Sequence, residues 1–146
     1  MRVKFFERRK KENGQALLEF ALVLPILFLL VFGAVDLGRV FFAQIALTNA
    51  AREGVRYLTI NPKDVSNAAG IFKSTIDATV QEAGFSGIVV PRNQVTVACT
   101  NRDDDPEHCD SGLPATVTVT YNFNLILGWI LPTPITLTRS AVMVVP

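Results

Sequence analysis

The pattern of apolar and polar positions divides the chain into a long N-terminal helix and a smaller mixed domain. Residues 20–35 carry no charge, and Glu19 is the one charged residue within the apolar run that begins at residue 15. A helix over residues 15–35 would rise about 31 Å, close to the roughly 30 Å hydrocarbon core of a bilayer. We therefore predict a transmembrane helix over residues 15–36, with Glu19 near one edge of the membrane.

The periodicity predicts that this helix continues beyond the membrane as an amphipathic segment as far as Leu58. Apolar residues recur there at steps of three and four, and polar residues occupy another side. The expected apolar face comprises Leu37, Val40, Phe41, Leu47, Ala51, Val55 and Leu58, and the polar stripe comprises Asn49, Arg52, Glu53 and Arg56. We interpret that stripe either as a surface facing solvent or another subunit, or as a specific interaction site.

A second helix is expected to follow. Asn61 and Pro62 suit an N-cap and a first helical residue, Asp64 suits the first turn, and Gly84 suits the C-terminal stop. The expected apolar face consists of Val65, Ala68, Ala69, Phe72, Ile76, Val80 and Ala83.

The remainder of the chain alternates with a period of two in residues 95–99, 116–123 and 135–143, which predicts three antiparallel strands with one face on a helix. Arg139 falls on the apolar side of the last strand, which predicts a bulge or a rim position. The fold class is therefore α+β: a long N-terminal membrane-spanning helix continuing into an amphipathic helix, a second helix and a small antiparallel sheet of about three strands. The apolar segment 125–132, LILGWILP, is either a buried loop closing the core or an apolar tip that meets the membrane or a neighbouring subunit.

Charge is distributed unevenly and predicts the orientation in the membrane. The first fourteen residues carry six basic and two acidic side chains, a net charge of +4, while the whole chain carries +1. A basic segment on one side of an apolar helix stays cytoplasmic. We therefore expect a leader over residues 1–14 and an extracytoplasmic domain over residues 37–146. Nucleic-acid binding would require basic and aromatic residues shared with a folded surface, so we expect no nucleic-acid partner.

The two cysteines, Cys99 and Cys109, fall in the part expected outside the cytoplasm, where disulfides persist. A disulfide would close an eleven-residue loop and contribute about 2.5–3 kcal/mol. The alternatives are free thiols, or a metal site that adds His108 and nearby carboxylates. A metal site is disfavoured because no CxxC pair is present and adjacent His108 and Cys109 are awkward joint ligands. We expect no metal and no cofactor.

No constellation typical of an enzyme is present in the sequence. It contains neither a Gly-rich phosphate loop nor a nucleophile elbow, and the single histidine lies in a proline-containing loop. We therefore expect no catalytic residues, and a membrane-bound enzyme is a third hypothesis that lacks a site.

The junction from Gly14 to Phe20 places an acid, Glu19, close to an amine that removal of the leader would create. If the leader is removed after Gly14, the new α-amine of Gln15 has a pKa near 8 and is mostly cationic. Glu19 lies four residues later on the same helix face and can neutralise that amine, or the amine of a neighbouring chain. The alternative is that Glu19 only occupies the headgroup layer.

The same residues resemble the class III signal of type IV pilin-like proteins, and the wider stretch resembles the TadE family of pseudopilins of the tight-adherence (Flp pilus) machinery. The resemblance rests on G-Q-A-x-x-E-F at residues 14–20, D-L-G-R at 36–39 and N-A-A-R-E-G at 49–54, with the ending ITLTRSAVMVV also similar. It implies a minor pilin-like subunit of the cytoplasmic membrane without catalysis of its own. Its partners would be a prepilin peptidase that cuts between Gly14 and Gln15, and other pilin-like subunits that assemble through Glu19 and Phe20.

The principal alternative is an uncleaved single-pass anchor presenting a small adhesion or interaction domain. An ordinary secretory signal is disfavoured, because the apolar stretch exceeds the usual length of about 7–15 residues.

Overall fold

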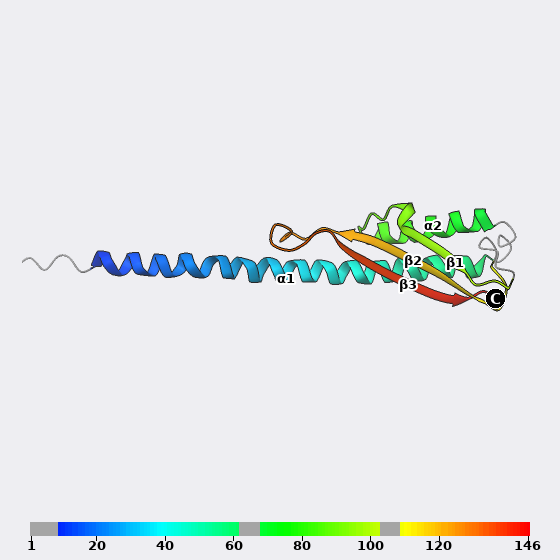
Figure 1. Cartoon of the computed structure of the whole chain (residues 1–146), viewed down its shortest axis with the longest axis horizontal. Coiled ribbons are helices and arrows are strands. Elements are labelled where there is room, and N and C mark those ends of the chain that lie inside the picture. Colours follow the sequence, from blue (N-terminus) through cyan, green and yellow to red (C-terminus); the bar gives the residue numbers. More distant parts are fainter. Residues whose placement is uncertain (1–8, 62–67, 103–108) are drawn as a thin grey trace, which may run out of the picture.

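In the computed structural model, a three-stranded sheet and a short helix lie along the C-terminal part of one very long helix (Figure 1). Residues 9–61, 68–102 and 109–146 are described. The elements are α1 (Arg9–Ile60), α2 (Ala68–Phe85), a 3-10 turn η2 (Arg92–Gln94), β1 (Val95–Cys99), β2 (Pro114–Phe123) and β3 (Ile135–Val144). The predicted α+β class, with a long helix, a second helix and three antiparallel strands, is confirmed.

Helix α1 is longer at both ends than the apolar pattern predicted. Its 52 residues include Pro25 and correspond to about 78 Å of helix. The helix begins at Arg9 rather than Gln15 because lysine, arginine and glutamate are good helix formers, so a polar segment need not end a helix.

The strands follow one another in the order β1-β2-β3, and both pairs are antiparallel. Pairing between β2 and β3 is continuous from Pro114 with Val144 to Phe123 with Ile135, so the predicted bulge at Arg139 is wrong. Arg139 is half-buried on the edge strand, and its guanidinium donates a hydrogen bond to the Gln44 side-chain oxygen on α1. The long side chain thus reaches a polar partner at the rim without any irregularity in the backbone.

One face of the sheet packs on α1 and α2. The predicted apolar face of α1 is confirmed at Leu47, Ala51, Val55 and Leu58 but is wrong at its N-terminal end. Leu37 and Phe41 were expected inward and are 72% and 67% exposed. Small residues form much of the buried face because they allow the helix backbone to lie close to the sheet. Besides Asp36, the buried α1 residues are Ala43, Ala46, Leu47, Ala50, Ala51, Gly54, Val55 and Leu58.

The residues of α2 that face the core also differ in part from the predicted ones. Its fully buried positions are Ile71, Thr75, Thr79 and Ala83, one turn apart, while the predicted Phe72, Ile76 and Val80 are only partly buried. The threonines occupy the centre of the interface because their short side chains fit against the glycine-containing surface of α1.

The C-terminal stop of α2 is Gly87, not the predicted Gly84. Gly87 has a φ of 74°, its N–H donates to the Gly84 carbonyl (2.9 Å), and the Ile88 N–H donates to the Ala83 carbonyl (3.0 Å). These two bonds form a Schellman motif, which requires a left-handed residue at Gly87. At the other end, Asn61 donates to the Tyr57 carbonyl of α1. The predicted roles of Pro62, Asp64 and Val65 lie outside the described residues.

Candidate functional site

The N-terminal half of α1 projects away from the rest of the chain and keeps its apolar side chains exposed (Figure 1). Among the described residues, α1 is the helix long and apolar enough to cross a membrane, and no residue in its most apolar window is buried. Leu17, Leu22 and Leu30 are 69%, 67% and 63% exposed. Such a continuous apolar surface on a bare helix requires a non-aqueous environment or partner helices.

The four residues of the predicted processing and assembly site lie on this bare segment. Gly14, Gln15, Glu19 and Phe20 are all exposed and helical, and none packs against the sheet or α2. Gln15 and Glu19 are four residues apart and so share one helix face. A Cβ added at Gly14 would meet nothing within 4 Å, so the packing of the chain does not require glycine there.

The exposed apolar surface continues past the predicted membrane boundary. Leu37, Phe41 and Ile45 form a line at four-residue spacing, which we call the outer apolar stripe, and they are 72%, 67% and 48% exposed. Further along α1 the surface becomes polar, as predicted, with Arg52 and Arg56 exposed. The outer apolar stripe is therefore a second unpartnered surface, directly continuous with the bare segment.

The polar stripe contains one bidentate ion pair. Arg56 donates to Glu53 through Nε (2.8 Å) and Nη2 (3.1 Å) within a single helix turn. The hydrogen bonds from Arg56 lower the pKa of Glu53, and Glu53 in turn raises the pKa of Arg56. Both side chains keep substantial solvent exposure, so we expect only a small contribution to stability.

At the junction between the bare segment and the domain, Asp36 is 4% exposed and binds the loop between β2 and β3. Its two carboxylate oxygens accept the backbone N–H groups of Ile126 and Leu127, each at 3.0 Å. Arg39, one turn later, donates to the same carboxylate at 3.0 Å. One acid on α1 thus binds a loop that lies 90 residues further along the chain.

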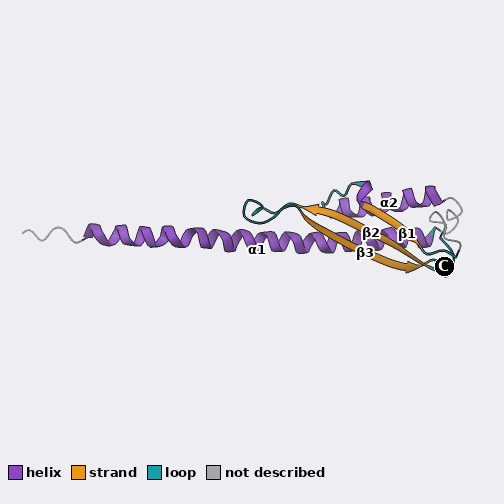
Figure 2. Cartoon of the chain, in the orientation of Figure 1, coloured by secondary structure: helices purple, strands orange, loops and turns teal. Residues whose placement is uncertain are grey.

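This loop, residues 124–134, extends beyond the ends of the strands and lies along α1 toward its bare half (Figure 2). Leu127 is 5% exposed, and its Cδ1 would lie 4.0 Å from a Cβ on Gly33. The other large side chains point away from the core: Ile126, Trp129, Ile130 and Leu131 are between 46% and 81% exposed. The interpretation of LILGWILP as a buried loop is therefore wrong except at Leu127 and the partly buried Leu125, and the exposed side chains form an apolar tip.

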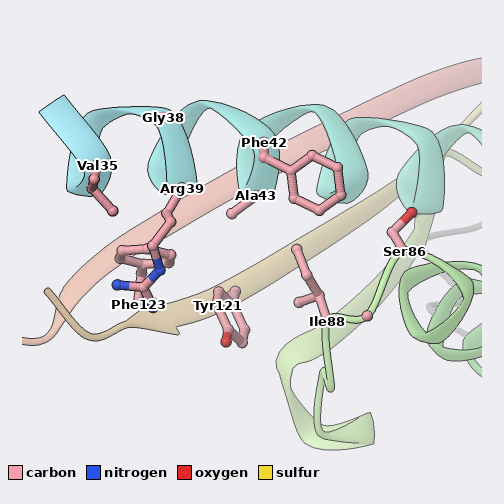
Figure 3. A pocket seen from close by; sticks show the side chains of 10 residues that line it. Val35, Gly38, Arg39, Phe42, Ala43, Ser86, Ile88, Tyr121 and Phe123 are labelled. Carbon is pink, nitrogen blue, oxygen red and sulfur yellow. The ribbon is translucent and has the colours of Figure 1, made fainter. Parts of the chain in front are cut away.

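A groove of about 450 Å³ lies between α1 and the end of β2, next to Asp36 (Figure 3). The Arg39 guanidinium lies 4.9 Å from the centre of the Phe123 ring at one end of this groove, in a cation–π contact. Phe42 and Ala43 line the helix side, and Tyr121 lines the strand side. Arg39 thereby contacts both the Asp36 carboxylate on α1 and Phe123 on β2.

The predicted disulfide is present and joins Cys99, at the end of β1, to Cys109, before β2, with a Cα–Cα distance of 5.1 Å. It closes the connection whose acidic segment, residues 103–108, lies outside the described residues. No group of three or more metal-binding side chains occurs in the described part of the chain. The prediction that the acidic segment binds no metal stays a prediction.

Gly54, at the end of N-A-A-R-E-G, has a structural explanation. It is buried where α1 meets α2 and β2, and an added Cβ would overlap the Thr79 hydroxyl and lie 3.2 Å from Val117 Cγ1. Ala50 and Ala51 are also fully buried. This part of the motif therefore allows α1 to pack closely against the domain.

The sequence analysis used Asp36 and Arg39 only as part of D-L-G-R at the end of the predicted membrane span, and it missed their role in binding the loop. One signal was available: an apolar loop near a membrane has backbone N–H groups that need acceptors. An acid and a base one turn apart could supply an acceptor and hold it in place. The sequence gives no indication, however, that this particular loop reaches Asp36.

Comparison with known proteins is informative for the N-terminal part of the chain. Residues 14–56 match the model of a family described as TadE-like protein. No curated protein and no solved structure matches the chain. The matched segment contains the bare apolar helix, Asp36 and the packing glycine Gly54, and it supports a structural involvement in tight-adherence pilus assembly and attachment to a membrane. Residues 14–56 are therefore similar to the TadE-like family.

Proposed function

We propose that this chain is a minor pilin-like subunit, a pseudopilin, of a tight-adherence or Flp-type pilus assembly and secretion system. It is cut by a prepilin peptidase after Gly14 and assembles through its apolar N-terminal helix. The observation that carries the proposal is the bare apolar half of α1, which no other part of the described chain covers and which lies within the family match. The outer apolar stripe extends the surface available to neighbouring helices.

The proposed topology has the leader, residues 1–14, in the cytoplasm and residues 37–146 outside it. The basic charge of the leader supports this orientation. The disulfide between Cys99 and Cys109 supports it independently, because such bonds persist in oxidising compartments. The helix segment 15–36 would then span the cytoplasmic membrane once.

Processing after Gly14 is supported by the lack of any packing reason for glycine at this position. Glycine destabilises a helix interior by about 1 kcal/mol relative to alanine, and nothing surrounds Gly14 that a side chain would strike. A weak, exposed point in the helix is easily unwound into the active site of a peptidase. The surrounding sequence would otherwise favour an uninterrupted helix.

Assembly is proposed to depend on Glu19 pairing with the new amine of Gln15, in its own chain or in a neighbour. Both positions are exposed on one helix face, where a neighbouring chain can reach them. A carboxylate at the edge of the hydrocarbon core is costly unless it is paired, so the amine created by cleavage would favour packing of helix beside helix. Phe20 would add an exposed aromatic contact next to the pair.

The experiment that tests processing is intact-mass analysis of the chain purified from membranes of its native host. A mature chain beginning at Gln15 is expected, and a Gly14→Val variant is expected to retain Met1–Gly14 because the peptidase must accommodate a β-branched side chain. Gly38→Val is the matched control, since Gly38 lies in the same helix and also has nothing within 4 Å of an added Cβ. If the wild-type chain retains residues 1–14 in the host, the processed pseudopilin is refuted and the uncleaved anchor with an interaction domain replaces it.

A further inference from the structure

The loop between β2 and β3 has an unusual combination of features for a segment that would face water. Trp129 is 81% exposed, and Ile126, Ile130 and Leu131 are each 46–48% exposed. A cluster of large apolar side chains on one loop indicates a contact surface, whereas single exposed apolar residues need no explanation. The loop contains no charged residue from Leu125 to Pro134.

Five backbone N–H groups of this loop donate hydrogen bonds within the chain. The N–H groups of Ile126 and Leu127 donate to Asp36. Those of Gly128, Ile130 and Leu131 donate to loop carbonyls at 3.3, 2.9 and 3.0 Å. An unsatisfied backbone group is costly in a medium without water, so these five bonds lower the cost of moving the loop out of water.

Gly128 makes the tight fold of the loop possible. An added Cβ would lie 2.8 Å from Thr133 Cγ2 and 3.1 Å from the Leu125 carbonyl oxygen. The two arms of the loop therefore touch across the glycine, and the exposed side chains are presented on a compact tip.

The position of the loop along α1 sets the medium that surrounds it. Leu127 packs on Gly33, and Asp36 binds the neighbouring backbone. A helix that crosses a roughly 30 Å hydrocarbon core from Gln15 uses about 20 residues and leaves the core close to Gly33–Asp36. The loop must lie at the depth of these residues, which is the boundary between lipid tails and headgroups.

We propose that residues 125–132 form an interfacial anchor that inserts into the lipid headgroup layer on the side of the domain, at a depth set by Asp36. The indole of Trp129 suits this layer because its ring is apolar and its N–H can still bond to water or headgroups. Together, the transmembrane helix and the loop attach the domain to the bilayer at two points and limit its tilt. The inference requires that α1 is inserted in a membrane, and it is independent of cleavage and of pilus assembly.

Trp129 is the single tryptophan of the chain, so its fluorescence reports on this loop alone. The full chain would be reconstituted at one copy per phosphatidylcholine nanodisc, so that no second copy can cover the loop. The lipids would carry a nitroxide quencher either near the headgroup or deep in the acyl chain. We expect strong quenching by the shallow label, weaker quenching by the deep label, and weak quenching by aqueous acrylamide.

Two results would overturn the inference. Strong quenching by acrylamide with none by either lipid label would leave the loop in water. Protection from all three quenchers would mean that the loop packs on protein instead.

The role of Asp36 is tested separately with Asp36→Asn, because an amide offers one acceptor oxygen in place of two. We expect the ratio of shallow to deep quenching to fall in this variant, since the loop is no longer held at one depth. Asp77→Asn is the matched control; this aspartate pairs with Arg92 (2.6 Å) on the far side of the domain. An unchanged ratio in Asp36→Asn would refute the role of Asp36 in setting the depth.

Discussion

Replacing Gly54 by alanine perturbs the interface at which α1 meets the domain. The added Cβ would overlap the Thr79 hydroxyl and would lie 3.2 Å from Val117 Cγ1 and 3.3 Å from Thr79 Cβ. The Thr79 hydroxyl cannot easily turn away, because it donates to the Thr75 carbonyl at 2.8 Å and the side chain is β-branched. Relief therefore requires α1 to move away from α2 or β2.

The magnitude follows from two opposing effects. Overpacking a close-packed core costs about 1–3 kcal/mol, and an overlap with two neighbouring elements corresponds to the upper end of that range. Alanine gains about 1 kcal/mol over glycine in helix propensity. The expected net loss in the free energy of unfolding is about 2 kcal/mol, which lowers the Tm of a domain of this size by roughly 8–16 °C.

The assay is urea unfolding of the full chain in mild detergent, followed by circular dichroism. Gly84→Ala is the matched control, because Gly84 is exposed in α2 with nothing within 4 Å of an added Cβ, and it should gain up to about 1 kcal/mol. In the double variant Gly54→Ala with Thr79→Ala, the overlapping hydroxyl is gone. The loss in the free energy of unfolding of the double variant should be smaller than the sum of the losses of the two single variants by about 1 kcal/mol or more.

Overpacking at position 54 is refuted if Gly54→Ala is as stable as Gly84→Ala, since the interface would then have room for a methyl group. It is also refuted if the losses in the free energy of unfolding caused by Gly54→Ala and Thr79→Ala are additive. Their effects would then be independent, and the contact between these two positions would not be the source of the loss.

Three further predictions concern other parts of the chain. Replacing both Cys99 and Cys109 by serine should lower the free energy of unfolding by about 2.8 kcal/mol for an eleven-residue loop, and urea unfolding that is unaffected by these changes or by reductant would contradict this. Glu53→Gln should cost less than about 1 kcal/mol near neutral pH, because the pair with Arg56 is largely exposed. The folded pKa of Glu53 lies below its ordinary value of 4.5, so the contribution of the ion pair to stability is complete above pH 4.5 and disappears as the pH falls through the folded pKa. The measurement is the free energy of unfolding of the wild type and the variant on both sides of this pH range. A difference that persists in acid would rule out the ion pair as its cause. Glu19→Ala should leave cleavage after Gly14 largely intact by intact mass and reduce pilus assembly in the host, so normal pili would argue against the pairing of Glu19 with an amine.

Much of the architecture is determined locally and could be predicted. The apolar run from residue 15 to residue 35 predicts a membrane-spanning helix because it is long enough to cross the hydrocarbon core, and its apolar window is bare in the structure. Alternation with a period of two gave the three strands, since successive side chains in a strand point to opposite faces. The prediction of a disulfide needed only two cysteines flanking a polar loop.

The orientation of the helices could not be predicted from periodicity alone. The predicted face of α1 is buried at Leu47, Ala51, Val55 and Leu58, whereas Phe41 is exposed and further alanines and Gly54 are buried beside that face. Periodicity identifies which residues share a face, but it does not reveal which of two adjacent faces meets the sheet. That choice depends on how closely the backbones can approach, and here Thr79 and Gly54 decide it.

The sequence by itself determined the class of elements, the presence of a long apolar helix and the resemblance of the N-terminal part of the chain to a TadE-like protein, because each of these depends on neighbours within a few turns. Only the tertiary structure decided that Asp36 binds a loop 90 residues away and that Trp129 of this loop is exposed. The physical reason is that the donors of this contact are backbone N–H groups, which every residue except proline carries, so no side-chain pattern can indicate which of them will reach the carboxylate.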